Sequence, residues 1–367
     1  MSLPRWAQCA RPRRLACVAR LAARTLAPLV VLAALLPLAA ARAGEPDAMA
    51  LLERMRSAAT AGNYQGTMVF SANGAISSSR VGHYCVGGQT YARLEAQDGR
   101  QQTVLRHNDE LRTVWPQSHL VVIEQREALA GWSTKAQAIE ERALLSYELR
   151  VEGQARVAGR DANVVLLEPR DTLRYAQRLW VDRGSGLMLR ADILGPGNAV
   201  LETAAFSEIE VGVKPDPQSV LRAMRGVDSR SDKVAQARAA SATRDGAGAV
   251  VPWRVLRPTQ RRTQLESEGW SLQTMVPGFR LASCSMRGLD SDGHEMSVLQ
   301  AVFSDGLTHV SLFVEPYRPG HHRGAVQARL GATGTVTRRV GEHWITVVGD
   351  APEPTLRQFA QALEPRR

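Results

Sequence analysis

The sequence predicts a mainly β protein with α-helices: a curved antiparallel half-barrel sheet with helices on its concave side, followed by a smaller α+β C-terminal domain. Short segments of alternating apolar and polar residues recur between turn residues such as Asn73-Gly74 and Gly87-Gly88. About eleven such segments precede Lys214, and a sheet of that many strands has to curl. A change of composition after Lys214 separates this region from a second series of strands.

The first 43 residues have the features of a secretory signal peptide. They contain many arginines and no acidic residue, followed by an apolar run from Leu26 to Ala40 and the small-residue site Ala41-Arg42-Ala43. The apolar run has about fifteen residues, fewer than the roughly 20 of a membrane-spanning helix. We therefore expect cleavage of a Sec-type signal and a mature chain that begins near Gly44.

Export changes the meaning of the composition. The formal net charge of +10 falls by the seven arginines of the signal to +3, which removes the argument for nucleic-acid binding. Cys9 and Cys17 leave with the signal, whereas Cys85 and Cys284 remain. In an oxidising compartment these two either form a disulfide or are two small buried residues, and the sequence leaves both interpretations open.

Residues 44–213 are predicted to form the first domain. It starts with an amphipathic helix from Asp47 to Ala61, and a second helical segment is predicted from Glu127 to Ser146. The predicted strands are Tyr64 to Ala72, Ala75 to Val86, Gln89 to Ala96, Arg100 to His107, Leu111 to Trp115, His119 to Glu124, Tyr147 to Ala158, Ala162 to Pro169, Arg174 to Arg183, Leu187 to Leu194 and Ala199 to Val211. A curved sheet closed only by helices is a natural cavity for an apolar ligand.

Residues 214–252 are predicted to be a linker with room for one short helix, because they have few large apolar residues. Residues 253–367 are predicted to form the second domain, which ends in a helix from Pro354 to Leu363. Its predicted strands are Arg280 to Met286, Ser297 to Phe303, Leu307 to Pro316, Thr333 to Val340 and His343 to Val348.

Motifs typical of catalytic or metal sites are missing from the mature sequence. His294-Glu295 begins like a zinc-protease motif, but Val298 stands where the second histidine belongs. His321-His322 has no carboxylate or cysteine at ligand spacing. We therefore predict no catalytic residue, no metal and no cofactor. Scattered residues can still assemble an active site, so an exported hydrolase stays as an alternative, with Asp192 and His83 as the first residues to test.

A series of short motifs runs through nearly the whole mature chain. Those in the first domain are Ser79-Arg80 with His83, Arg93-Leu94 with Asp98-Gly99, Tyr147-Glu148-Leu149, Gly159-Arg160, Tyr175 to Asp182, and Leu187 to Asp192. Those in the second domain are Val276-Pro277-Gly278-Phe279, Phe303-Ser304-Asp305-Gly306-Leu307, and Val347-Val348-Gly349-Asp350 with Pro352. In this order, behind an export signal, they resemble the RseB family, also called MucB, of regulators of the envelope-stress sigma factor sigma-E.

This resemblance implies a periplasmic binding protein and not an enzyme. Such a protein is a negative regulator: it binds the periplasmic segment of a membrane-anchored anti-sigma factor of the RseA/MucA type and protects that segment from proteolysis. The resemblance also implies that the first domain is similar to the carriers LolA and LolB and senses lipid or lipopolysaccharide acyl chains. The linker is longer and richer in alanine and arginine than in that family, so the interdomain geometry stays open, as does the oligomeric state, a homo-oligomer included.

Candidate ligand and partner residues follow from the two expected activities, lipid sensing and anti-sigma factor binding. An acyl chain gains about 0.8 kcal/mol per methylene buried, so apolar side chains on one strand face can sense lipid without catalysis. For each lining candidate the alternative of an ordinary core position is favoured over ligand contact, because alternation alone does not show which face holds lipid. These candidates are Met68, Phe70, Leu94, Trp115, Leu179, Val181, Leu187, Leu189 and Ile193. The candidates for the second-domain wall of a partner cleft between the domains, each of which could equally be a turn or packing residue, are Phe279, Asp305, Leu307 and Arg329. The competing interpretation is a periplasmic lipoprotein or lipid carrier, which would not need residues 253–367.

Overall fold

The computed structural model describes residues 48–125, 139–227, 253–291, 294–322, 324 and 327–366. The predicted signal peptide, most of the predicted linker and the larger part of the predicted helical segment from Glu127 to Ser146 lie outside these ranges. The described end of that segment is a 3-10 helix, η2 (Glu141–Leu145). In the described ranges no helix is both long and apolar enough to cross a membrane.

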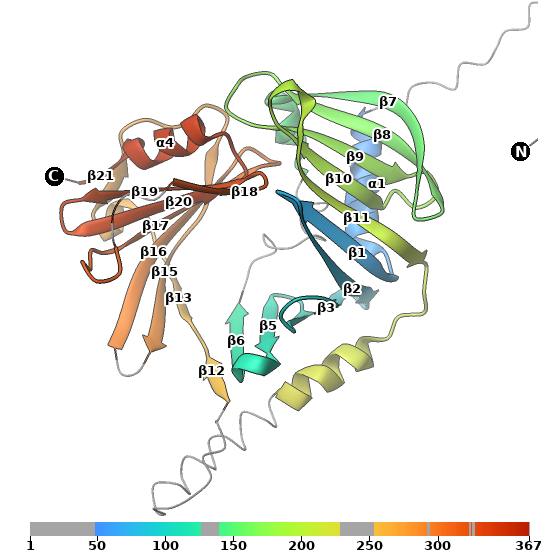
Figure 1. Cartoon of the computed structure of the whole chain (residues 1–367), viewed down its shortest axis with the longest axis horizontal. Helices are drawn as coiled ribbons and strands as arrows, with labels where there is room; N and C mark the ends of the chain where they lie inside the picture. The colour runs from blue at the N-terminus through green and yellow to red at the C-terminus, as the bar shows by residue number, and fades with distance from the viewer. Residues whose placement is uncertain are drawn as a thin grey trace, which may run out of the picture. The chain divides into compact units, whose positions relative to one another are not determined.

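The first sheet has twelve strands in the order β12-β6-β5-β4-β3-β2-β1-β11-β10-β9-β8-β7, and it is curved and unclosed (Figure 1). Its strands are β1 (Tyr64–Ala72), β2 (Ala75–Val86), β3 (Gln89–Ala96), β4 (Thr103–His107), β5 (Glu110–Trp115), β6 (Leu120–Gln125), β7 (Tyr147–Val157), β8 (Arg160–Pro169), β9 (Ala176–Asp182), β10 (Met188–Leu194), β11 (Val200–Val211) and β12 (Arg254–Leu256). Antiparallel pairing of β1 with β11 joins the two series of hairpins. The predicted fold class, mainly β with a large curved sheet and a smaller C-terminal sheet domain, is confirmed. The sheet differs from the prediction in its parallel β12–β6 pair and in carrying helices on both faces and not on one.

The turn between β1 and β2 shows why the hairpins were predictable. Ala72 pairs with Ala75, and the two residues between them, Asn73 and Gly74, have φ angles of 50° and 77°. Positive φ at both central positions is the geometry of the hairpin turn that Asn-Gly favours. The observed β1, β2 and β3 have the predicted bounds.

Strand β12 belongs to the first sheet, although its residues follow the predicted linker. Residues from Trp253 onward are expected in the second domain, but Arg254–Leu256 pair in parallel with Leu120–Val122 of β6. The Trp253 ring stacks on that of His119 at 5.3 Å. A strand of three residues is too short for its side-chain pattern to reveal it in the sequence.

Two helices pack on opposite faces of the first sheet. Helix α1 (Ala48–Ala61) lies across β8–β10, and its Ala58 packs in a cluster with Val81 and Leu94 (Figure 1). A helix over 217–227, inside the predicted linker, packs with Tyr84 and Tyr91 instead. Successive side chains of a strand alternate between faces, so Val81 and Tyr84 point to opposite sides of β2. The start of the predicted linker is therefore a structured part of the first domain.

The second sheet has seven strands in the order β13-β15-β16-β17-β20-β19-β18, with helix α4 (Glu353–Ala362) packed on it. Its strands are β13 (Thr259–Arg262), β15 (Arg280–Ser291), β16 (His294–Ser304), β17 (His309–Pro316), β18 (Gln327–Leu330), β19 (Thr333–Val340) and β20 (His343–Gly349). Short strands β14 (Trp270–Leu272) and β21 (Leu363–Pro365) form a separate pair beside the 3-10 helix η4 (Glu266–Glu268). The predicted strands and closing helix are present, whereas the four strands β13, β14, β18 and β21 were not predicted because they are short.

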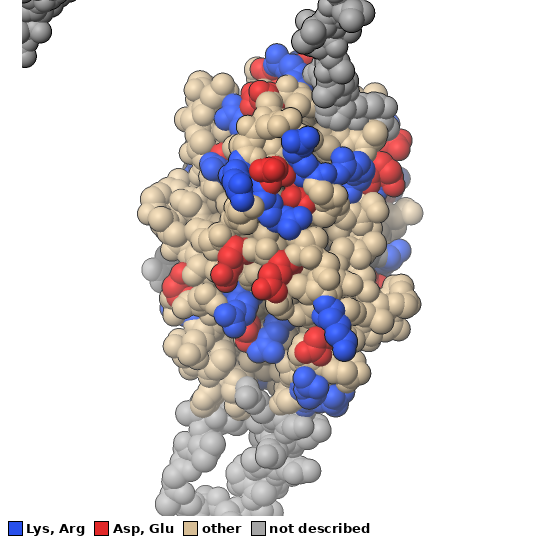
Figure 2. Space-filling view, turned by 90° about the vertical axis from the view of Figure 1, so that its right-hand side faces the viewer, with Lys and Arg blue, Asp and Glu red and all other residues tan. Residues whose placement is uncertain are grey.

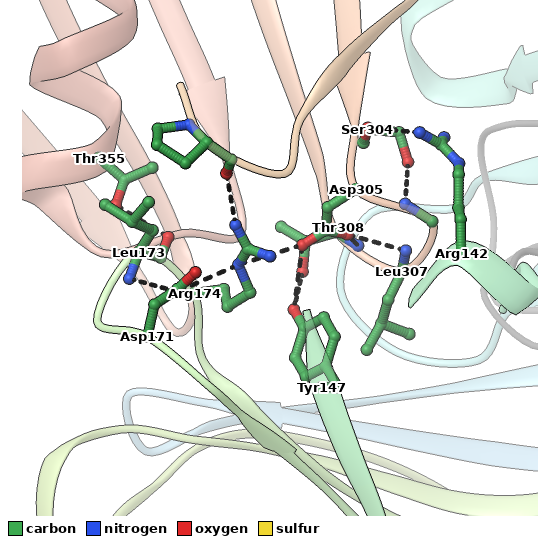
Figure 3. A network of polar contacts seen from close by, with 12 residues as sticks. Arg142, Tyr147, Asp171, Leu173, Arg174, Ser304, Asp305, Leu307, Thr308 and Thr355 are labelled. Carbon is green, nitrogen blue, oxygen red and sulfur yellow. Dashed lines mark hydrogen bonds and ion pairs between the residues drawn. The ribbon is translucent and has the colours of Figure 1, made fainter. Parts of the chain in front are cut away.

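The two sheets meet around the buried side chain of Arg174, from the connection between β8 and β9 (Figure 3). Its Nη2 donates to the Pro277 carbonyl oxygen at 2.7 Å, and its guanidinium lies over the Phe279 ring at 5.0 Å. Its Nε lies 3.4 Å from Oδ2 of Asp305, whose side chain is also fully buried, and 3.3 Å from Oδ1 of Asp171. The positive charge of Arg174 in the first sheet thus neutralises the negative charge of the Asp305 carboxylate in the second.

A second buried ionisable group, His83 on β2, lies beneath the end of α1. Its Nδ1 is 2.9 Å from the Gly62 carbonyl oxygen, and its ring stacks on that of Tyr64 at 5.0 Å. Its Nε2 has no hydrogen-bond partner among the described residues. Burial, and then the charge of Arg106, lower the pKa of His83 below its ordinary value of 6.5, although the Gly62 carbonyl acts in the opposite direction.

We expect Arg174→Met to lower the free energy of unfolding by about 3–5 kcal/mol, because it leaves the Asp305 carboxylate buried without its cation. The matched control is Arg357→Met on α4, whose ion pair with Glu353 at 2.6 Å is exposed and is worth at most about 1 kcal/mol. Urea unfolding measures both losses. Equal losses in the two variants would show that the Arg174 side chain is solvated in solution.

Acidification should destabilise the protein through His83. The unfolded chain takes up a proton near pH 6.5 while the folded chain resists it, so the stability linked to this residue is complete above that pH and falls below it. Unfolding free energies measured at about pH 7.5 and about pH 5 should therefore fall less in His83→Phe than in the unsubstituted protein. His321→Phe, at an exposed histidine, should leave the difference unchanged. The same pH dependence in His83→Phe would contradict this assignment.

Candidate functional site

The predicted lipid-lining residues lie in several places. Leu179 and Val181 belong to a cluster beneath α1, which we call the α1 core. Met68, Leu94 and Leu187 belong to the neighbouring cluster around Tyr64. The members of the α1 core are Leu51, Leu52, Met55, Ala59, Ile139, Ala143, Tyr147, Val165, Leu167, Leu179, Val181, Met188 and Leu307.

The other four lining candidates differ in burial and in the residues they contact. Leu189 is fully buried. Ile193 packs with Tyr175 and Ala332, so it contacts the second half of the chain. Phe70 is 37% exposed and Trp115 is half-buried. Strand alternation identified apolar positions, but it did not show which of them share a cluster, because sheet curvature decides that.

The turn between β16 and β17 brings two predicted partner residues, Asp305 and Leu307, to the first sheet (Figure 3). Oδ1 of Asp305 accepts hydrogen bonds from the backbone N–H groups of Leu307 at 2.9 Å and Thr308 at 2.7 Å. Gly306 between them has φ of 99°, and a Cβ there would lie 2.9 Å from the Ala143 nitrogen. Only glycine fits both the conformation and the close approach.

Polar groups of the first sheet hold this turn. The Gly306 carbonyl oxygen accepts from the Glu140 N–H at 2.9 Å, and that of Ser304 accepts from Arg142 Nη1 at 3.0 Å. Tyr147 donates to Oδ2 of Asp305 at 3.3 Å. Burial, and then the Asp305 charge, raise the pKa of Tyr147 well above its ordinary value. The phenol therefore stays protonated and available as a donor.

Leu307 inserts into the α1 core, and it is the one member of that core, as far as the structure describes the chain, that follows the predicted linker. A residue of the first sheet likewise enters the core of the second. Leu173 packs against the second-sheet core, and its carbonyl oxygen accepts a hydrogen bond from Thr355 Oγ1 at 2.8 Å. Burying a leucine side chain stabilises by about 1.5–3 kcal/mol. Each sheet thus completes its core with a residue of the other.

The remaining two partner candidates also contact the first sheet. Phe279 packs on Arg174 and, at a ring distance of 5.2 Å, on Phe359. Arg329 Nη2 donates to the Tyr175 hydroxyl at 2.9 Å. All four predicted residues therefore lie where the sheets meet. We call the set formed by Arg174, Tyr147, Pro277, Phe279 and residues 304–308 the junction.

Sequence reasoning missed a polar pocket of about 840 Å³ that includes the face of β1–β3 opposite α1. Its charged lining residues are Arg80, Arg93, Glu95, Glu208 and Glu210. Several polar groups in and around it are satisfied within the protein, since Gln65 donates to Glu210 at 2.7 Å and Thr67 to Glu208 at 2.8 Å. Basic and acidic side chains are likewise interspersed over the face in Figure 2, without a broad area of one sign.

The residues of the hydrolase alternative have separate surroundings. Asp192 accepts from Arg190 at 2.7 Å and from Thr203 at 2.9 Å, whereas His83 lies against Gly62 and Tyr64. Among the described residues no group of three or more His, Cys, Asp or Glu side chains could hold a metal ion. Cys85 in the first sheet and Cys284 in the second are free thiols.

Comparison with known proteins finds similarity over the residues of both sheets. The chain matches the model of the MucB/RseB N-terminal domain over residues 47–224 and that of the MucB/RseB C-terminal domain over residues 264–364. It is 28% identical over 360 residues to the sigma factor AlgU regulatory protein MucB of Pseudomonas aeruginosa, an alignment that covers 93% of this chain and 98% of that protein. It is 23% identical to the sigma-E factor regulatory protein RseB of Escherichia coli K12, covering 87% and 91% of the two chains.

A solved structure, that of MucB in complex with MucA(peri), superimposes with a TM-score of 0.60 at 26% identity, covering 88% of this chain and all of that one. The two domain models together match well over half of the chain, and the resemblance inferred from its motifs is confirmed. The chain belongs to the MucB/RseB family of sigma factor regulatory proteins.

Proposed function

We propose that this protein is a periplasmic negative regulator of an envelope-stress sigma factor. It binds the periplasmic segment of a membrane-anchored anti-sigma factor and protects that segment from proteolysis. Lipid or lipopolysaccharide acyl chains, sensed by the first sheet, release it.

The observation that carries this proposal is the similarity to MucB solved in complex with MucA(peri), because it extends over both sheets of this chain. A likeness confined to the first sheet would support lipid binding alone. The junction adds a physical argument: Leu307 and β12 make the second half of the chain part of the first-sheet structure. A carrier has no need of such coupling, whereas a regulator does.

Acyl sensing is supported by the apolar side chains beneath α1. The α1 core and the adjacent Tyr64 cluster contain five of the nine predicted lining residues. The polar pocket on the other face has a charged lining and does not suit a hydrocarbon chain. We therefore place the acyl site on the α1 side of the sheet.

The mature chain should bind the periplasmic segment of an RseA/MucA-type anti-sigma factor from its own organism with a Kd of about 1 μM or tighter. Calorimetry measures this affinity, and a scrambled segment is the control. The bound segment should also be cut more slowly by the first protease of the release cascade. Failure to bind the segment, together with capture of lipoproteins alone from an envelope extract, would favour the carrier.

A charge on the α1 side should weaken acyl binding. Met68→Glu places a carboxylate in the Tyr64 cluster, where an unpaired buried charge costs several kcal/mol, so the affinity for a fluorescent fatty acid should fall by about tenfold or more. The matched control is Ile76→Glu on the neighbouring strand, where the side chain is 71% exposed. Circular dichroism checks folding, and Met68→Gln replaces the variant if it is unfolded. Unchanged affinity in a folded Met68 variant would move the acyl site elsewhere.

A further inference from the structure

We propose that the Leu307 side chain occupies the place in the α1 core that the end of a bound acyl chain takes, so that acyl binding expels the 304–308 turn and opens the junction. This inference rests on the acyl sensing proposed above. It adds the residue that an acyl ligand displaces and the route by which the second sheet responds.

Leu307 is held in the α1 core differently from the other members of that core. It comes from a turn of the second sheet, whereas the other members come from α1, from first-sheet strands or from residues 139–143 beside η2. It is 8% exposed, while Leu167, Val165 and Tyr147 have no exposed surface. It therefore lies at the margin of the core. A branched hydrocarbon side chain at the margin can be replaced by another hydrocarbon with little change in the rest of the cluster.

The polar contacts that hold the turn, among the described residues, include the hydrogen bonds from Glu140, Arg142 and Tyr147 and the ion pair with Arg174 described above. Water can replace these partners once the turn leaves, whereas the apolar surface exposed by Leu307 would have no substitute except another apolar group. An acyl chain supplies that group.

Displacement of Leu307 is coupled to Arg174 through Asp305. The Leu307 N–H donates to Oδ1 of Asp305, and Oδ2 of the same carboxylate faces Arg174 Nε and the Tyr147 hydroxyl. Leu307 cannot leave the α1 core without disturbing this carboxylate. Tyr147 takes part on both sides, since it also belongs to the α1 core.

Coupling of this kind is reciprocal. If acyl binding expels Leu307, the inserted Leu307 must weaken acyl binding, and removing the leucine side chain must strengthen it. In the full mature chain, Leu307→Ala should bind the fluorescent fatty acid cis-parinaric acid about tenfold more tightly than the unsubstituted protein, because a larger fraction is competent to bind. Leu330→Ala, at a leucine that is 62% exposed at the end of β18, should bind like the unsubstituted protein.

Hydrogen exchange on the unsubstituted protein gives a test that does not depend on the folding of any variant. Saturating fatty acid should accelerate exchange of the Leu307 and Thr308 amides, which Asp305 protects, but not of amides within β19. Unchanged or weaker fatty-acid binding by Leu307→Ala would overturn the proposed displacement of Leu307. Unchanged exchange at these two amides in a protein that binds the fatty acid would do the same. Absence of fatty-acid binding in both proteins would refute acyl sensing itself, and the displacement of Leu307 with it.

Discussion

The ion pair between Arg174 and Asp305 is the constraint on which the relation between the two sheets depends. Both side chains are fully buried, and Arg174 Nε and Nη1 have no hydrogen-bond partner among the described residues. A buried charge pair is seldom the most stabilising choice, and apolar residues of the same volume often serve better. What the pair provides is a defined alignment of the sheets, because either charge left alone in the interior is strongly unfavourable. The junction in this structure is therefore held in one well-defined alignment.

The four residues expected to form the wall of a partner cleft lie at the contact between the two sheets. Phe279, Asp305, Leu307 and Arg329 contact the first sheet in this conformation. Under the proposed function, their effect on an anti-sigma partner would therefore be indirect, through the alignment of the two sheets. The second sheet is also structurally coupled to the first, because Leu307 and Leu173 each complete the core of the opposite sheet.

Much of the fold could be predicted because turn chemistry and strand alternation are local. Asn73-Gly74 fixed one hairpin, and β1 to β3 have the expected bounds. Parts that depend on distant contacts could not be predicted. Strand β12 exists because β6 offers it an edge, and the 217–227 helix is buried because Tyr84 and Tyr91 face it. Of the site, the motifs around Pro277 and Asp305 were identified as important, but their partner Arg174 was not, because no sequence pattern links it to residues more than a hundred positions away.

The central claim is that acyl binding and anti-sigma binding are linked through the junction. The most direct measurement is the affinity of the full mature chain for the anti-sigma periplasmic segment, titrated at increasing fatty-acid concentration. The account predicts that the affinity falls and then reaches a plateau, as reciprocal coupling requires. It also predicts that Arg174→Met starts near that plateau and responds little to the fatty acid. An affinity that is independent of fatty acid in the unsubstituted protein, or an undiminished response in Arg174→Met, would contradict it.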